Sequence, residues 1–179
     1  MNRILFFLIC LWLSFSIAHA ASDKRIAVLE FRNLNQNPTY DYLSSGFAKA
    51  LTQSLKLLPD LVVVDRMHMG QIIREQAFGQ SAFVDAQTGS ALGKLLGANL
   101  LLTGSFQIAD KQIKVSVHVI NVETGEIETK NSFSLTGKMD QIFAFQEQLA
   151  LEAVNKLDLN LPVAVKKQFE AASYATNSL

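Results

Sequence analysis

Hydrophobic positions in the first half of the chain alternate between short continuous runs and a helical period. Apolar runs at residues 25–31 and 61–64 are typical of buried strands. Between them, apolar side chains recur at about every fourth position from Tyr40 to Leu58, which predicts one face of an amphipathic helix. Pro59 follows directly and is expected to end that helix.

Two more helices are predicted before Gly97. Asp65 and Asp85 each precede a partial apolar stripe, and each is expected to cap the helix that follows. Arg66, beside the first of these caps, is expected to form a structural bridge. Gly97 is expected to end the second helix, because glycine readily adopts the left-handed backbone conformation found at helix ends.

From residue 99 onward the hydrophobic period changes to two. Residues 99–108 predict a strand. The alternation at 113–119 predicts a second strand with one buried and one solvent-exposed face. A third strand is predicted at 127–135, with its apolar side chains on one face. Gly137 leads into a last amphipathic helix that reaches Leu157.

The predicted order of elements is therefore β-α-β-α-α-β-β-β-α. The first two strands are joined through a helix and should pair in parallel by a right-handed crossover. The last three strands are joined by short turns and should form an antiparallel meander. We expect an α/β fold, in which a mixed sheet of about five strands carries helices packed on it.

The first twenty residues are typical of a secretory signal peptide. Arg3 precedes an apolar run from Ile4 to Ile17, and the segment ends in Ala18-His19-Ala20, a small-x-small cleavage site after Ala20. The alternative is a retained anchor, but the run is shorter than the roughly 20 residues that span a bilayer. We therefore expect a signal peptide at 1–20, one α/β domain at 21–158 and a short C-terminal tail at 159–179, working outside the cytoplasm.

Composition narrows the chemistry of the exported chain. Its single cysteine, Cys10, and single tryptophan, Trp12, both lie in the predicted leader, so a disulfide scaffold and cysteine catalysis are excluded after cleavage. In the full chain, lysine and arginine balance aspartate and glutamate to a formal net charge of zero, and loss of Arg3 with the leader changes this by only one charge, which gives no reason to expect nucleic acid as a partner. No second long apolar run follows the leader, so no transmembrane span is predicted in the mature chain.

No arrangement of residues predicts a catalytic, cofactor-binding or metal site. His68 and His118 do not have the spacing of zinc ligands, and Gly-x-Ser-x-Gly and phosphate-loop motifs are absent. Three carboxylates at positions 123, 126 and 128 surround a predicted turn, where a solvated loop is the simpler interpretation. We therefore expect no cofactor and no enzyme activity.

An ordered series of short motifs resembles a known family. Residues 26–34, Ile-Ala-Val-Leu-Glu-Phe-Arg-Asn-Leu, are similar to the opening strand of TolB N-terminal-like domains. The middle of the chain resembles the CsgG-like family, the curli secretion channel and its relatives, in motifs at residues 64–66, 72–76, 81–88, 93–98 and 102–105. Residues 119–126 resemble the family's hairpin, with Asn121 at the place of an aspartate. The resemblance covers about Arg25 to Leu157.

The resemblance implies a non-catalytic periplasmic domain used in assembly and secretion at the cell envelope. The curli channel of this family is a lipoprotein that inserts two long amphipathic hairpins per subunit into the outer membrane. The surroundings of Cys10 do not form a lipobox, and the predicted meander leaves no room for such hairpins. We therefore expect the periplasmic core of the family without its membrane hairpins, with outer-membrane association left open.

Two hypotheses about function follow. In the first, the chain is an interaction module that docks on an unidentified envelope protein or forms a homo-oligomer, and an activator of peptidoglycan synthesis is one version. Phe31, Tyr40 and Tyr42 are its candidate interface anchors, with core or rim packing as the alternative. In the second, an enzymatic or small-ligand site lies at the carboxyl ends of the parallel strands, near residues 33–39 and 65–67.

Overall fold

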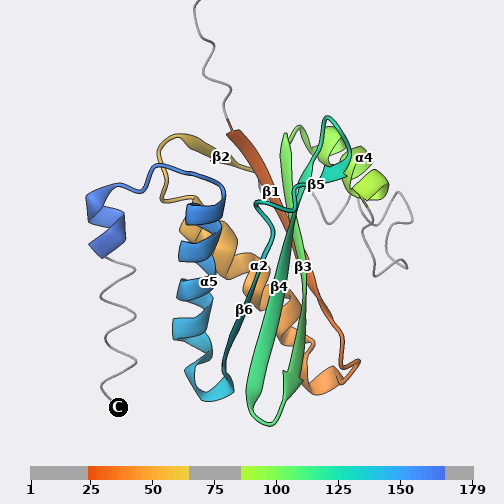
Figure 1. Cartoon of the computed structure of the whole chain (residues 1–179), viewed down its shortest axis with the longest axis vertical. Helices are drawn as coiled ribbons and strands as arrows, with labels where there is room; N and C mark the ends of the chain where they lie inside the picture. Colours follow the sequence, from red (N-terminus) through yellow and green to blue (C-terminus); the bar gives the residue numbers. More distant parts are fainter. Residues whose placement is uncertain (1–23, 65–85, 168–179) are drawn as a thin grey trace, which may run out of the picture.

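The computed structural model describes residues 24–64 and 86–167, which form a six-stranded mixed sheet with helices on both faces (Figure 1). The strand order is β2-β1-β3-β4-β5, and β6 also pairs with β4. β1 pairs in parallel with β2 and β3, whereas β4 pairs antiparallel with β3, β5 and β6. The predicted α/β fold with a mixed sheet is thereby confirmed.

The elements follow the predicted order over most of the described residues. The strands are β1 (Lys24–Asn33), β2 (Leu61–Val63), β3 (Leu100–Ala109), β4 (Gln112–Asn121), β5 (Glu126–Ile127) and β6 (Phe133–Lys138). The helices are η1 (Pro38–Tyr40), α2 (Tyr42–Leu55), α4 (Ala86–Leu96), η3 (Met139–Gln141) and α5 (Ile142–Lys156). The helix predicted to follow Asp65 lies outside the described residues.

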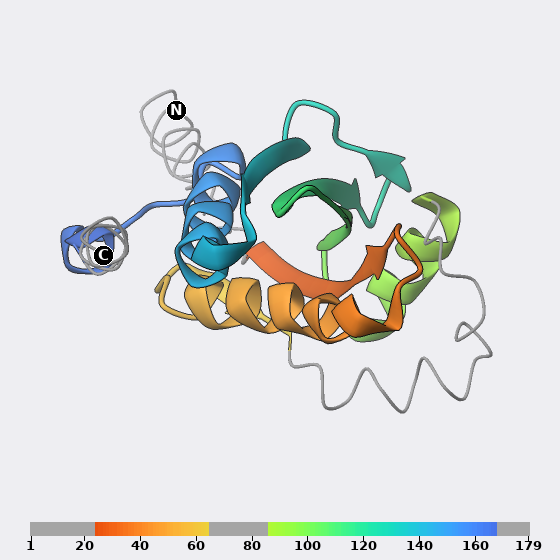
Figure 2. The same ribbon diagram turned by 90° about the horizontal axis from the view of Figure 1, so that it is seen from below.

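The main hydrophobic core lies between one face of the sheet and helices α2 and α5 (Figure 2). The alternating residues of β4 supply one wall, as the period of two predicts: Ile113, Val115, Val117 and Val119 are buried. Phe47 of α2 occupies the centre, with its ring centroid 5.8 Å from that of Phe31, 5.6 Å from that of Phe106 and 6.2 Å from that of Phe145. Aromatic contacts thus join both helices to the sheet.

A smaller core lies on the opposite face of the sheet, under α4. Its buried members are Ala27, Leu29, Leu92, Leu96, Ala98, Leu101, Ile120 and Val122. The close approach of α4 to the residue that follows β4 depends on Gly93, because a Cβ atom there would overlap the side chain of Val122. Beyond α4, the same face carries polar side chains, including Ser105, Ser116 and Ser134 on neighbouring strands.

The predicted third strand of the meander is wrong in one respect. Residues 127–135 are divided between two strands, β5 and β6, with a turn between them, where one strand was expected. The turn is held by the Ser132 hydroxyl, which donates to the Glu128 carbonyl at 2.9 Å, and by the Asn131 amide, which donates to the Glu128 carboxylate at 2.6 Å. Ile127 is consequently exposed, whereas Phe133 and Leu135 pack against the main core.

Candidate interaction surface

The three candidate anchors lie at different depths. Phe31 is 1% exposed and belongs to the main core, so the expectation that it contacts a partner does not fit its burial. A register shift between Val28 and Phe31 turns its ring toward α2, where simple alternation would place it on the α4 face. Tyr40 is partly buried against the main core, and Tyr42 is 63% exposed in the first turn of α2.

A further exposed aromatic side chain, which the sequence pattern did not single out, lies in the first turn of α5. Phe143 is 78% exposed, more than any other large hydrophobic residue described. The helical period does not mark it as exposed, because Ala150 and Val154 lie on the same side of α5 two and three turns later and are buried. Its exposure shows only once the position of α5 on the molecule is known.

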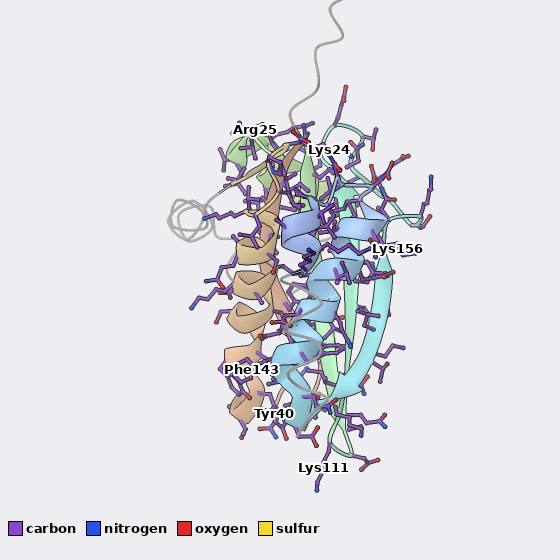
Figure 3. The ribbon with its side chains drawn as sticks, turned by 90° about the vertical axis from the view of Figure 1, so that its left-hand side faces the viewer. Lys24, Arg25, Tyr40, Lys111, Phe143 and Lys156 are labelled. Carbon is purple, nitrogen blue, oxygen red and sulfur yellow. The ribbon has the colours of Figure 1, made fainter. Side chains whose placement is uncertain are left out.

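Helices α2 and α5 place Tyr42 and Phe143 at one end of the molecule. Both helices begin at this end, and Figure 3 shows Phe143 and Tyr40 there, away from Lys24 and Arg25 at the other. The helices approach closely at Gly46, where a Cβ atom would lie 3.7 Å from the side-chain nitrogen of Gln146. Gly46 follows Tyr42 by one turn, and Gln146 follows Phe143 by one turn. We call Tyr40, Tyr42 and Phe143 the aromatic end.

One carboxylate lies on the same side of α5 as Phe143. Glu147 follows Phe143 by one helical turn, and its Oε2 atom is buried without a hydrogen-bond partner among the described residues. Burial raises the pKa of the Glu147 carboxyl above its ordinary value of 4.5, because the charged form loses hydration. An apolar ring and a carboxylate that is costly to ionise therefore lie on one side of α5.

The loop after β1, a candidate ligand site in the second hypothesis, uses its polar side chains to hold its own shape. The Asn35 side chain forms two bonds to the backbone of Ile108, donating to its carbonyl at 2.8 Å and accepting from its amide at 2.7 Å. The Asn33 amide donates to the Asp41 carboxylate at 2.9 Å, and the Asn37 side chain accepts from the Thr39 amide at 3.0 Å. These groups build the turn into α2.

The predicted caps are only partly within the described residues. α4 ends at Leu96, and Gly97 adopts a φ of 64°. The amide of Ala98 donates to the carbonyl of Gly93 at 2.9 Å, and that of Gly97 donates to the carbonyl of Lys94 at 3.1 Å, a Schellman arrangement. Asp65, Arg66 and Asp85 lie outside the described residues.

The described part of the chain holds no group of three histidine, cysteine, aspartate or glutamate side chains placed to bind a metal ion. His118 is exposed on β4, opposite Thr103 in the register. Of the three carboxylates around the turn, Glu128 accepts from Asn121 and Asn131, whereas Glu123 and Glu126 are exposed. Within residues 24–64 and 86–167, no helix is long and apolar enough to span a membrane.

Several solved structures are similar to this one at low sequence identity. Lipoprotein GNA1162 from Neisseria meningitidis has a TM-score of 0.56 and 12% identity, over 78% of this chain and 99% of its own. The C-terminal domain of LpoB from Salmonella enterica has a TM-score of 0.50 and 13% identity, over 65% of this chain and 83% of its own. TolB from Acinetobacter baumannii has a TM-score of 0.49 and 12% identity, over 76% of this chain and 28% of its own.

Sequence comparison assigns the family. No curated protein sequence matches the chain. The family model for the curli production assembly/transport component CsgG matches residues 14–114, which is more than half of the 179 residues. This match includes β1, α2, β2, α4 and β3, and it confirms the resemblance found in the motifs. The chain therefore belongs to the CsgG family.

Proposed function

We propose that this protein is a non-catalytic interaction and assembly module of the cell envelope, located in the periplasm after cleavage of its leader behind Ala20. Membership of the CsgG family, whose description is curli production assembly and transport, supports a role in envelope assembly. The two-residue turn between β3 and β4 and the short turn between β4 and β5 support a periplasmic core without the long membrane hairpins. Its partners are an envelope protein and further copies of the chain.

The aromatic end is the observation that carries this proposal. Tyr42 and Phe143 expose 63% and 78% of their surface, although burying aromatic side chains of this size stabilises a fold by several kcal/mol. Aromatic residues are enriched among the side chains that dominate binding energy at protein interfaces. Docking would cover both rings at the end of the molecule where α2 and α5 begin.

Site-specific photo-cross-linking in intact cells tests the proposal. A photoreactive phenylalanine analogue at position 143 or 42 should give one discrete adduct with an envelope protein. The same analogue at Leu57, which is 49% exposed just beyond α2, should give none and is the matched control. Equal labelling at all three positions, or recovery of the protein in the cytoplasm with its leader attached, would contradict the proposal. A peptidoglycan synthase in the adduct would select the activator version.

The ligand-binding hypothesis remains the second candidate, and residues 33–39 are its testable part. The amide groups of Asn33, Asn35 and Asn37 already bond within the protein, which favours a structural role for this loop. Replacing Asn35 with alanine should therefore lower stability. Loss of a measurable ligand or activity with stability unchanged would instead support the second candidate.

A further inference from the structure

One edge of the sheet, within residues 24–64 and 86–167, presents a strand with a neighbour on one side. In this part of the chain β6 pairs with β4 only, and the six residues Phe133–Lys138 form the edge on the side of α5 (Figure 1). The opposite edge, β2, has only three residues. An edge strand exposes the backbone N–H and C=O groups that point away from its neighbour, and these groups can pair with another strand.

The register shows which backbone groups of β6 point outward. The amide of Met139 donates to the carbonyl of Lys111 at 2.9 Å, and hydrogen-bonded pairs in an antiparallel ladder recur at every second residue. Gly137, Leu135 and Phe133 therefore direct their backbone groups toward β4. Ser134 and Thr136 direct theirs away from it, and both residues are exposed. Among the described residues, no backbone hydrogen bond to these outward groups is found.

The side chains of β6 define what can pair with it. Ser134 and Thr136 lie on the polar face of the sheet, whereas Leu135 and Phe133 lie on the face of the main core and are only partly buried. An added strand must therefore alternate between polar side chains on the first face and apolar side chains on the second. β6 itself has this pattern, and a two-fold axis perpendicular to the sheet keeps each face on its own side.

We propose that two copies of this chain associate through their β6 strands, antiparallel about a two-fold axis at Leu135. Ser134 then lies opposite Thr136 of the second copy, and these residues exchange about four backbone hydrogen bonds across the axis. On the core face, Leu135 meets its own copy, and Phe133 lies opposite Gly137, a large side chain beside a small one. Lys138, the only charged residue of β6, lies opposite Ser132, so no like charges face each other.

This inference deepens the homo-oligomer part of the proposed function, by naming the surface and its symmetry. The cross-linking experiment probes side chains at the starts of α2 and α5, whereas the experiments on β6 probe the edge of the sheet. Loss of the β6 contact would leave docking of an envelope protein at the aromatic end unaffected. The two proposals can therefore fail separately.

A proline variant tests the edge directly. The N–H of Thr136 points outward, so Thr136→Pro removes a bond of the dimer and none to β4. Light scattering of the complete exported protein should show a dimer with a Kd below roughly 100 μM. The Thr136→Pro variant should be monomeric at the same concentration with an unchanged circular dichroism spectrum. A wild-type monomer, or an oligomer that the proline variant leaves intact, would overturn the proposal.

A matched pair of charge variants tests the register without proline. Thr136 lies opposite Lys114 on β4, so Thr136→Glu places a glutamate beside a lysine within one chain. Adding Ser134→Glu sets two glutamates against each other at each cross-copy pair, and the dimer should dissociate. Adding Ser134→Lys instead sets lysine against glutamate, and the dimer should persist. Because the two variants differ only at position 134, identical association states would refute the proposed register.

Discussion

The two faces of the sheet hold their helices by different means. The α2–α5 side buries a large cluster with four phenylalanine rings, in which Phe47 touches the other three. The α4 side, as far as the described residues extend, buries a smaller cluster with no aromatic ring. There the backbone of the helix approaches the sheet at Gly93, against Val122. The packing of α2 and α5 on the sheet depends on large buried side chains, whereas the packing of α4 depends on the close approach of its backbone.

This difference predicts different stabilities for the two sides. Large buried aromatic side chains lose much transfer energy when truncated, and the cavities that they leave add to that loss. The small aliphatic cluster under α4, over the described residues, has less apolar area to lose, so α4 should open at a lower free energy than α2 and α5. Substitutions on the α2–α5 side should therefore report on global unfolding, and those on the α4 side on local opening.

The largest effect is expected at the centre of the α2–α5 side. Phe47→Ala should lower the free energy of unfolding by about 3–5 kcal/mol, because Phe47 is fully buried among three other rings. Urea denaturation followed by circular dichroism measures this change. Tyr42→Ala on the same helix is the matched control, and its effect should stay within about 0.5 kcal/mol, because Tyr42 is exposed. Similar losses for the two variants would contradict the assignment of the core.

Adding a side chain at Gly93, where α4 approaches the sheet, should have the next largest effect. Gly93→Ala favours the helix intrinsically by about 1 kcal/mol, but its Cβ would overlap the side chain of Val122, so a net loss of about 1–2 kcal/mol is expected. Hydrogen exchange should show weaker protection of α4 amides, with α2 amides unchanged. Ala91→Ser, at an exposed position of the same helix, is the control. Equal loss of protection in α2 would remove the distinction between the two sides.

The end of α4 provides a smaller and more local test. Gly97 has a φ of 64°, a conformation that costs a residue with a Cβ atom roughly 1 kcal/mol. Gly97→Ala should therefore destabilise the protein by about that amount, and Gly97→Asn by less, because asparagine tolerates this region better. Thermal unfolding of the two variants measures the order. A more stable alanine variant would show that the helix does not depend on this terminus.

The comparison also shows what the sequence could and could not predict. The α2–α5 side was predicted well, because the period of four in residues 43–55 and the period of two in β4 directly encode its buried faces. The irregular features of the backbone were not predicted. The register shift that turns Phe31 inward and the turn that separates β5 from β6 depend on tertiary pairing and on local side-chain bonds of Glu128.

The candidate surface was predicted only in part, for a related reason. Tyr42 was identified, but an apolar residue in a helix carries no sign of whether a neighbouring helix covers it. Phe143 lies next to buried Ala144 and Phe145, and its exposure depends on where α5 crosses α2. The outward backbone groups of Ser134 and Thr136 likewise follow from the register with β4, which a single sequence does not contain.

The smallest effect is expected at Glu147, on the Phe143 side of α5, and it depends on pH. Burial raises the pKa of this carboxyl in the folded state, so the folded protein binds the proton more tightly than the unfolded chain. The contribution of Glu147 to stability is therefore most favourable at low pH and declines as the pH rises past the ordinary pKa of 4.5.

Glu147→Gln keeps the shape of the side chain and removes this titration. The stability of the variant relative to the wild type should increase with pH, and urea denaturation at a series of pH values measures that difference. A difference that stays constant with pH would show that ionisation of Glu147 costs the folded protein nothing, because its buried Oε2 atom then has a compensating partner in solution.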